Sequence, residues 1–222
     1  MTWTRLKLIE WTADYLKKQG IENPRLESEI LLAHVLGKKR IDLYLAFDRP
    51  VELEELSRYK SLIQRRLKHE PLQYLTGRQE FWSMEFKVGP GVLIPRPETE
   101  CLIEQALKKF KSQKDSPLHI LDLGTGSGVL AVVLAKALPL STLWAVECSE
   151  RALTYAMENA KTHGVSSQIH FQKSDLFSGL DPSQKFNLII SNPPYLTEEE
   201  WSRLPSLLKS DITLCLKLHL VL

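Results

Sequence analysis

Residues 118–128 read LHILDLGTGSG, an apolar run of strand length that ends in a glycine-rich turn. The next residues, Val129-Leu130-Ala131, begin a helical pattern, so the stretch predicts a strand, a tight turn and a helix in direct succession. Glycine lets the backbone turn sharply and lets a ligand approach where a Cβ would otherwise stand. The spacing is G-x-G-x-G, which differs from the G-x-G-x-x-G dinucleotide fingerprint and therefore disfavours NAD.

The alternation of strand and helix continues along the chain. Strands are predicted at residues 118–123, 142–147, 168–172 and 186–191, and helices at 128–137 and 150–163. This order predicts an α/β fold, a Rossmann-like parallel sheet that helices cover on both faces. In such sheets ligands bind outside the carboxyl ends of the strands, so the residues that follow each strand are the candidates for a site.

Polar residues follow the second and third predicted strands. Glu147 ends the second strand, where an acidic side chain can bind both hydroxyls of a ribose. Asp122, at the end of the first strand, has the plainer interpretation of ordering the glycine turn by hydrogen bonds. Asp175 and Leu176 offer a polar group beside an apolar flank, which suits an adenine ring. Together these features predict an S-adenosylmethionine pocket, formed by Gly124, Thr125, Gly126, Ser127, Gly128, Glu147, Asp175 and Leu176.

Residues 191–195 read SNPPY and follow the fourth predicted strand. Two consecutive prolines end the strand and hold the backbone extended. Because proline has no N–H, the main chain here offers acceptors and few donors, while Asn192 adds a carbonyl acceptor and Tyr195 a flat aromatic face. Such a corner suits a planar –NH2 group, either a carboxamide or an exocyclic amine. Asn192, Pro193 and Tyr195 are the catalytic candidates, and Pro194 completes the substrate-binding stretch.

The first 70 residues carry helical patterns and no catalytic constellation. The patterns cover residues 3–19, 24–36, 41–46 and 51–68. Asn23 before Pro24 predicts a helix start, and Gly37 predicts its end. On the last helix the apolar side is expected to hold Leu53, Leu56, Leu62 and Leu67. A small helical bundle with a recognition or docking role is therefore predicted.

A different pattern links the bundle to the sheet. Residues 80–94 predict a β-hairpin that turns at Gly89-Pro90-Gly91, and a helix is predicted at about residues 98–111. The chain thus divides into a helical part at 1–70, a hairpin linker at 71–95, a sheet-forming part at 96–204 and a tail at 205–222.

Composition limits the classes of protein that this chain can represent. A hydrophobic content of 43% and a charged content of 25% are ordinary for a soluble globular protein. A net charge of +2 gives no prediction of direct nucleic-acid binding. The three cysteines are far apart in sequence and form no CxxC pair, which fits a reducing cytoplasm. No metal motif, signal peptide or membrane-length apolar run is found, so neither a metal nor a membrane is predicted.

The chain resembles the release factor glutamine methyltransferases of the HemK/PrmC type, a family of class I S-adenosylmethionine-dependent methyltransferases. The stretches PLQYLTG (71–77) and VLIPRPETE (92–100) are specific to that family. LDLGTGSG (121–128) and SNPPY (191–195) complete the match, although Asn-Pro-Pro-Tyr by itself is shared with adenine-N6 DNA methyltransferases. The resemblance extends from about residue 3 to residue 204, and the N-terminal helical part also fits the family.

The resemblance implies a reaction and a substrate. The reaction would be S-adenosylmethionine-dependent N5-methylation of the glutamine in the Gly-Gly-Gln motif of peptide chain release factors, in the cytoplasm. Gly124 to Gly128, Glu147, Leu176 and Asn192 would line the cofactor, and residues 192–195 would hold the glutamine amide. The N-terminal bundle would recognise the substrate. Glu147 stands where many relatives carry aspartate, and its longer side chain should still reach a ribose.

The resemblance ends after Leu204. In residues 205–222, apolar residues alternate with others from Ile212 to Leu222, which fits either one more strand or a frameshifted or truncated reading frame. In either case the sheet is expected to be incomplete at its C-terminal end. Two other functions stay open, the second of them because of the missing C-terminal strands. One is methylation of a ribosomal protein glutamine or of adenine N6, and the other is a catalytically silent fragment that binds the cofactor or a release factor.

Overall fold

The computed structural model describes residues 2–113 and 116–192 of the chain. The chain divides into two compact units, Met1–Thr76 and Gly77–Leu222. Three of the four residues predicted to grip the substrate, Pro193, Pro194 and Tyr195, lie outside the described residues. The predicted tail at 205–222 and its alternating strand also lie outside them.

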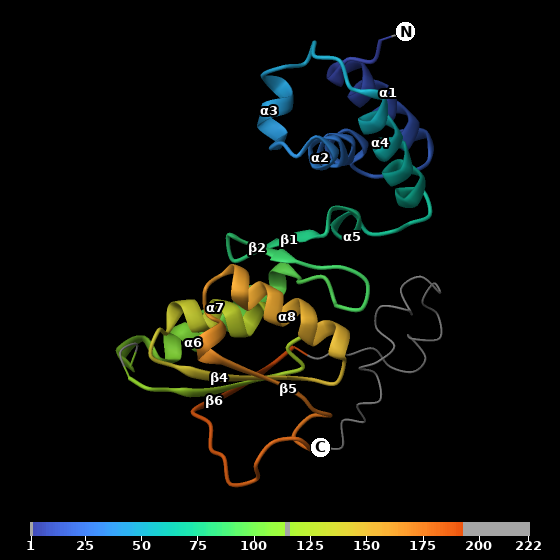
Figure 1. The fold of residues 1–222 in the computed structure, drawn as a ribbon. Helices are drawn as coiled ribbons and strands as arrows, with labels where there is room; N and C mark the ends of the chain where they lie inside the picture. The colour runs from blue at the N-terminus through green and yellow to red at the C-terminus, as the bar shows by residue number, and fades with distance from the viewer. Residues whose placement is uncertain (1, 114–115, 193–222) are drawn as a thin grey trace. The chain divides into compact units, whose positions relative to one another are not determined.

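The N-terminal unit is helical, as the sequence predicts (Figure 1). A side-chain oxygen of Thr4 accepts a hydrogen bond from the Lys7 N–H at the start of the first helix, and Gly37 ends the second in the left-handed conformation. The last helix of the unit, one of its two five-residue helices, was not predicted. The helices are α1 (Arg5–Lys18), α2 (Pro24–Leu36), α3 (Arg40–Tyr44), α4 (Leu53–Arg66) and α5 (Leu72–Thr76).

One apolar core holds these helices together. Ile9, Leu31 and Leu32 are fully buried in it, together with Tyr59 and Ile63 of α4. The expectation that Leu53 belongs to the apolar side of α4 is wrong, because its side chain is 86% exposed. Leu53 begins the helix, and at 100° per residue it points roughly a quarter turn away from the face that Tyr59 and Ile63 share.

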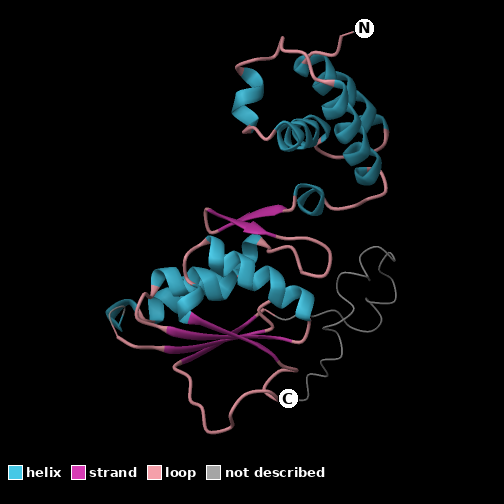
Figure 2. Ribbon diagram, viewed as in Figure 1, coloured by secondary structure: helices cyan, strands magenta, loops and turns pink. Residues whose placement is uncertain are grey.

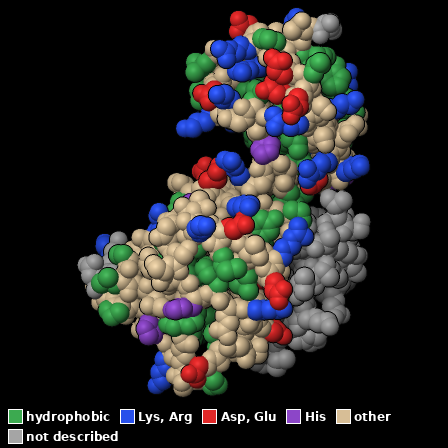
Figure 3. All heavy atoms as spheres, viewed as in Figure 1, with side chains coloured by type: hydrophobic (Ala, Val, Ile, Leu, Met, Phe, Trp, Pro, Cys, Tyr) green, Lys and Arg blue, Asp and Glu red, His purple; other side chains and the backbone are tan. Residues whose placement is uncertain are grey.

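Charges of both signs cover the N-terminal unit. In Figure 3 basic and acidic side chains lie side by side on the visible face of this unit. The buried carboxylate of Glu29 pairs with Arg25 and Arg40 at 3.1 and 3.2 Å, and Glu27 pairs with Arg66 at 2.7 Å. The visible face therefore carries mixed charge rather than one continuous basic surface.

The second unit begins with the hairpin, but its turn is not where the sequence predicts it. Strands β1 (Arg78–Phe81) and β2 (Met84–Lys87) pair antiparallel, and Trp82 and Ser83 form the turn between them. Both turn residues have positive φ, 53° and 54°, which matches the twist of a two-residue hairpin. The backbone N–H of Trp82 donates to the Glu100 carboxylate at 2.7 Å, which helps to hold this turn.

The predicted second hairpin strand at 92–94 is therefore wrong. Val92 does not pair as a strand but packs with Val88 against Ala152, a residue of a later helix. Gly89-Pro90-Gly91 form a turn, in which the Val92 N–H donates to the Gly89 carbonyl at 3.3 Å. The sequence signal was a true turn, but it marks a loop rather than a hairpin.

Within the described residues, four parallel strands form the sheet in the order β5-β4-β3-β6 (Figure 2). This confirms the predicted α/β fold with a parallel sheet. The strands are β3 (His119–Leu123), β4 (Thr142–Glu147), β5 (Ile169–Lys173) and β6 (Leu188–Ser191). The helices are α6 (Glu100–Lys109), α7 (Val129–Ala137) and α8 (Glu150–Thr162), and short 3-10 turns lie at Pro97–Thr99, Lys111–Gln113 and Ser166–Gln168.

The prediction that helices cover both faces is wrong for the described residues. Figure 1 shows α6, α7 and α8 on one side of the sheet and the helix-free connection from β5 to β6 on the other. Right-handed crossovers from β3 to β4 and on to β5 step in one direction, so α7 and α8 must share a face. The core lies between these helices and the sheet, and on the opposite face Ile189 is 52% exposed.

Candidate functional site

The carboxyl ends of β3 and β6 lie side by side and place the two sequence motifs together. Leu123 pairs with Ser191 in the parallel register, and the Ser191 hydroxyl donates to the Leu123 carbonyl at 2.6 Å. The glycine-rich loop follows Leu123, and Asn192 follows Ser191. Strand pairing thus brings Asn192 beside a loop that is distant from it in the sequence.

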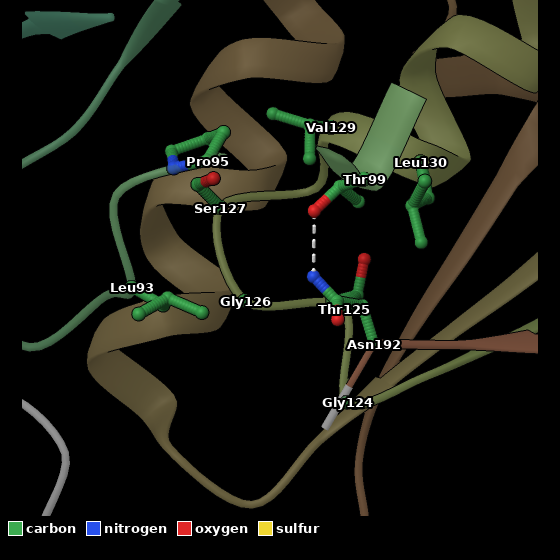
Figure 4. Close-up of a pocket in the computed structure, with 10 residues that line it drawn as sticks. All are labelled: Leu93, Pro95, Thr99, Gly124, Thr125, Gly126, Ser127, Val129, Leu130 and Asn192. Atoms are coloured by element: carbon green, nitrogen blue, oxygen red, sulfur yellow. Dashed lines mark hydrogen bonds between the residues drawn. The ribbon is translucent and has the colours of Figure 1, made fainter. Parts of the chain in front are cut away.

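A cleft lies between this loop and the segment that precedes α6 (Figure 4). Residues 124–127 of the glycine-rich loop form one side, and Asn192 contributes to the same cleft. The other side was missed by the sequence reasoning, although the VLIPRPETE stretch that forms it carried part of the family resemblance. The lining residues are Leu93, Pro95, Thr99, Gly124, Thr125, Gly126, Ser127, Val129, Leu130 and Asn192.

Asn192 is held by a buried hydroxyl. Its side-chain Nδ2 donates to Oγ1 of Thr99 at 2.8 Å, the bond that is dashed in Figure 4. Thr99 is 6% exposed and ends the 3-10 turn Pro97–Thr99. The contact connects the start of α6 with the end of β6 across the cleft.

The conformation of the glycine-rich loop depends on Glu147. Gly126 has a φ of +56°, and its N–H donates to Oε2 of Glu147 at 3.0 Å. The other oxygen, Oε1, accepts from the N–H groups of Cys148 and Ser149 at 2.9 and 3.2 Å. Glu147 therefore ties the loop after β3 to the end of β4, and the ribose contact expected of it stays a prediction.

Asp122 also stabilises the glycine-rich loop through hydrogen bonds. Its Oδ2 accepts from the Thr125 hydroxyl at 2.6 Å and from the Ala131 N–H at 3.2 Å, so it connects the loop with the first turn of α7. Oδ1 is buried and has no hydrogen-bond partner among the described residues. Burial raises the pKa of Asp122 to about 7, and the nearby charge of Glu147 adds to the rise. This geometry fits the interpretation that Asp122 orders the glycine turn.

Asn159 is a second residue that the sequence reasoning missed. It is 1% exposed on α8, and its Nδ2 donates to the carbonyl oxygens of Lys87 and Ser127, both at 2.9 Å. Its Oδ1 accepts from the Lys87 N–H at 2.7 Å. One amide thus joins the hairpin strand β2 to the glycine-rich loop. A single asparagine within a helical pattern gave no signal of this role.

Two described residues that were predicted to bind the adenine, Asp175 and Leu176, are not brought into the cleft. Asp175 and Leu176 follow β5, two strands away from β3, and neither lines the cleft that the described residues form. Asp175 is exposed, whereas Leu176 is half-buried with a φ of +50°. Their proposed contact with an adenine ring stays a prediction, as do the roles of Pro193, Pro194 and Tyr195.

The described residues were expected to hold neither a metal nor a membrane span. Among residues 2–113 and 116–192, no group of three or more His, Cys, Asp or Glu side chains is arranged to hold a metal ion. In the same part of the chain, no helix has both the length and the apolar character that crossing a membrane requires.

Both units of this chain are similar in sequence to known protein families. The PrmC N-terminal domain family matches residues 7–77, and the methyltransferase small domain family matches residues 99–205. A release factor glutamine methyltransferase from Rhodopirellula baltica is 44% identical over 207 residues, which are 92% of this chain and 70% of that protein. The chain belongs to the release factor glutamine methyltransferase family. The resemblance inferred from the four sequence stretches is thereby confirmed.

Other members of the family give a consistent result. The release factor glutamine methyltransferase from Geobacter sulfurreducens is 45% identical over 87% of this chain and 66% of its own length. The one from Chlorobaculum tepidum is 41% identical over 91% of this chain and 71% of its own length. The chain therefore spans 66–71% of the length of these three relatives.

The matched segments agree with the division of the structure. The methyltransferase small domain match begins at Thr99 and includes the glycine-rich loop and Asn192, so it contains both sides of the Thr99–Asn192 contact. The PrmC N-terminal match ends at Gly77, where the second compact unit begins.

Proposed function

We propose that this protein transfers a methyl group from S-adenosylmethionine to the side-chain amide nitrogen of the glutamine in the Gly-Gly-Gln motif of peptide chain release factors. The observation that supports this most directly is the shared cleft of Asn192 and the glycine-rich loop. An amide-binding side chain and a cofactor-binding loop lie together there, in a chain whose relatives are named for this activity.

The glycine-rich side of the cleft leaves room for part of S-adenosylmethionine. A Cβ added at Gly124 or Gly126 would meet nothing within 4 Å, so the loop leaves open space for a ligand to approach its backbone. Gly124 to Gly128 would hold the amino-acid part of the cofactor, Glu147 the ribose, and Asp175 and Leu176 the adenine. When bound, the cofactor supplies an electrophilic methyl group on a positively charged sulfur.

The task of Asn192 is to orient a poor nucleophile. An amide nitrogen attacks weakly because its lone pair is delocalised into the carbonyl. Acceptors from the Asn192 side chain and the Pro193 carbonyl would take the two N–H hydrogens of the glutamine, and Tyr195 would flank the amide. Orientation of this kind lowers a barrier by about 7–11 kcal/mol in favourable cases. The same acceptors stabilise positive charge that develops on the nitrogen.

No separate general base is needed in this proposal, since the proton can leave after the transfer. The N-terminal unit, matched by the PrmC N-terminal domain family, is proposed to recognise the release factor. A translation factor as substrate places the reaction in the cytoplasm, and neither a metal ion nor a nucleic acid takes part in it.

The role of Asn192 is tested by Asn192→Ala in an assay of labelled methyl transfer to a purified release factor. Turnover should fall roughly 100-fold or more, because one positioned partner of the reacting group is lost. The dissociation constant for S-adenosylmethionine should change only a few-fold. Ser112→Ala, at an exposed position of the turn Lys111–Gln113, is the control and should keep full activity. Near-normal turnover in Asn192→Ala would contradict the proposal.

The same assay separates the proposed substrate from the alternatives. A release factor with its motif glutamine replaced by alanine should accept no label. Label on that variant, on ribosomal protein or on DNA would show that the protein methylates a different target. Tight binding of the release factor without any methyl incorporation would indicate a silent binding fragment.

A further inference from the structure

The amide of Asn192 must face the right way for the proposed reaction. A side-chain amide has an acceptor, Oδ1, on one side and a donor, Nδ2, on the other. A glutamine –NH2 group brings donors, so only the Oδ1 side of Asn192 can bind it. Rotation of the Asn192 amide by 180° would place donor against donor. Some group must therefore set the orientation of this amide.

Thr99 is the group that contacts the donor side. Nδ2 of Asn192 donates to Oγ1 of Thr99 at 2.8 Å, so the amide presents its acceptor oxygen on the side away from Thr99. In Figure 4 the two side chains point toward each other within the cleft that the glycine-rich loop lines. Asn192 follows β6 directly, and its bond to Thr99 reaches across 93 residues of sequence.

Thr99 is a rigid partner. Its N–H donates to the Arg96 carbonyl at 3.0 Å, and its side chain is 6% exposed. The turn that it ends continues into α6, whose Ile103 and Ala106 are buried in the core of the sheet unit. Proline at residues 95 and 97 restricts the backbone on the approach to this turn. The turn that carries the Thr99 hydroxyl is thus anchored to the core of the sheet unit through α6.

We propose that Thr99 is a positioning residue that holds the Asn192 side chain in the observed orientation, with Nδ2 on the threonine hydroxyl and the acceptor oxygen turned toward the substrate nitrogen. The inference rests on the proposed function and deepens it. It states that a residue outside the SNPPY stretch helps the site to bind a substrate side chain that carries N–H groups. Thr99 itself touches neither of the reacting atoms in this scheme. It acts through Asn192.

The test uses Thr99→Val, which keeps the branched shape and removes the hydroxyl, and Thr99→Ser, which keeps the hydroxyl. Thr99→Val should lower kcat for release factor methylation by up to about 100-fold, as expected when a reacting group is misplaced. The KM for S-adenosylmethionine should stay within about threefold of the wild type, since the loop that binds it is unchanged. Thr99→Ser should restore kcat to within a few-fold of wild type.

Thr162→Val is the matched control. The Thr162 hydroxyl donates to the Glu158 carbonyl at 2.9 Å on the exposed side of α8, so the same substitution removes a threonine hydroxyl away from the cleft. This variant should retain wild-type kcat. Wild-type kcat in Thr99→Val would overturn the inference. A folded Thr99→Ser with low kcat would also overturn it, and this second criterion holds even where Thr99→Val fails to fold.

A direct measurement separates this inference from the proposed function. The side-chain ¹H–¹⁵N resonances of Asn192 report its hydrogen bond whether or not a methyl group is transferred. They should shift in Thr99→Val and stay in place in Thr162→Val. An inactive wild type with the expected shift would reject the proposed function while supporting the Thr99–Asn192 contact. Resonances that do not respond to Thr99→Val would overturn the inference whatever the activity.

Discussion

Asp122 is a carboxylic acid enclosed entirely by protein. Its side chain is 0% exposed, and its hydrogen bonds from Thr125 and Ala131 reach only Oδ2. Burial disfavours the charged form more strongly than these bonds favour it, so the pKa rises to about 7. Near neutral pH, a small change in pH therefore changes the charged fraction of Asp122.

This environment predicts a pH-dependent stability. The folded protein keeps the proton of Asp122 up to pH about 7, whereas the unfolded chain releases it near pH 4. Between these values the folded state binds more protons, so the contribution of Asp122 to the free energy of unfolding falls as the pH rises and levels off above pH about 7. Asp122→Asn should remove this slope, as measured by urea unfolding between pH 4 and 8.

Asp181→Asn provides the control for that series. Asp181 is exposed, and hydrogen bonds from Ser183 lower its pKa, so its titration lies below the window in question. This variant should keep the wild-type slope between pH 4 and 8. A slope that persists in Asp122→Asn would show that another group titrates with folding.

At the scale of elements, the glycine-rich loop is shaped by its contact with a neighbouring helix. Gly128 precedes α7 with a φ of +82°, and a Cβ there would lie 3.0 Å from both Cα and Cβ of Ala156 on α8. That distance is shorter than an ordinary van der Waals contact. The start of α7 can therefore approach α8 only where no side chain stands between them.

Gly128→Ala should shift the loop away from α8. We expect a loss of roughly 1–3 kcal/mol in the free energy of unfolding from the forced contact, together with weaker S-adenosylmethionine binding. Gly164→Ala is the matched control, because Gly164 has a similar φ of +72° and a Cβ there meets nothing within 4 Å. The two variants share the strain of the backbone, so the difference between them measures the contact. Equal losses of stability in Gly128→Ala and Gly164→Ala would show that the contact with Ala156 has no effect.

At the scale of the whole molecule, the chain has two compact units with separate cores. Leu32 is fully buried in the core of Met1–Thr76, while Leu121 and Leu134 are fully buried in Gly77–Leu222. Among residues 2–113 and 116–192, no buried residue belongs to both of the main clusters that form these cores. Damage to one core should therefore remain within its own unit.

Leu32→Ala tests this separation. The substitution should cost about 2–5 kcal/mol in the stability of the N-terminal unit, because it leaves a cavity in a closed core. Amide hydrogen exchange should rise across residues 2–76 and stay at wild-type rates in the sheet at 119–191. Leu45→Ala is the control, since Leu45 lies in the same unit and is 80% exposed. Faster exchange in the sheet of Leu32→Ala would show that the units unfold together.

Local sequence signals were sufficient to predict most helices and strands. They failed where a tertiary contact determines the local conformation. The strand at Thr142–Glu147 was predicted at its observed bounds, because alternation and length are properties of the segment itself. The hairpin turn was misplaced, because glycine and proline at 89–91 were the stronger local signal and Trp82 and Ser83 carry none. Their positive φ angles occur in a turn whose Trp82 N–H binds Glu100, a residue of α6.

By itself, the sequence determined the parallel α/β sheet, the helical N-terminal unit, the glycine-rich loop and the family, because these follow from periodicity and from motifs that are continuous in the chain. Only the tertiary structure decided that Thr99 holds Asn192 and that Asn159 holds Ser127. Each of these contacts joins segments that meet only after β3, β6 and the helices have packed. A contact between side chains that are so far apart in the chain produces no periodic pattern in the sequence, so it cannot be predicted from periodicity.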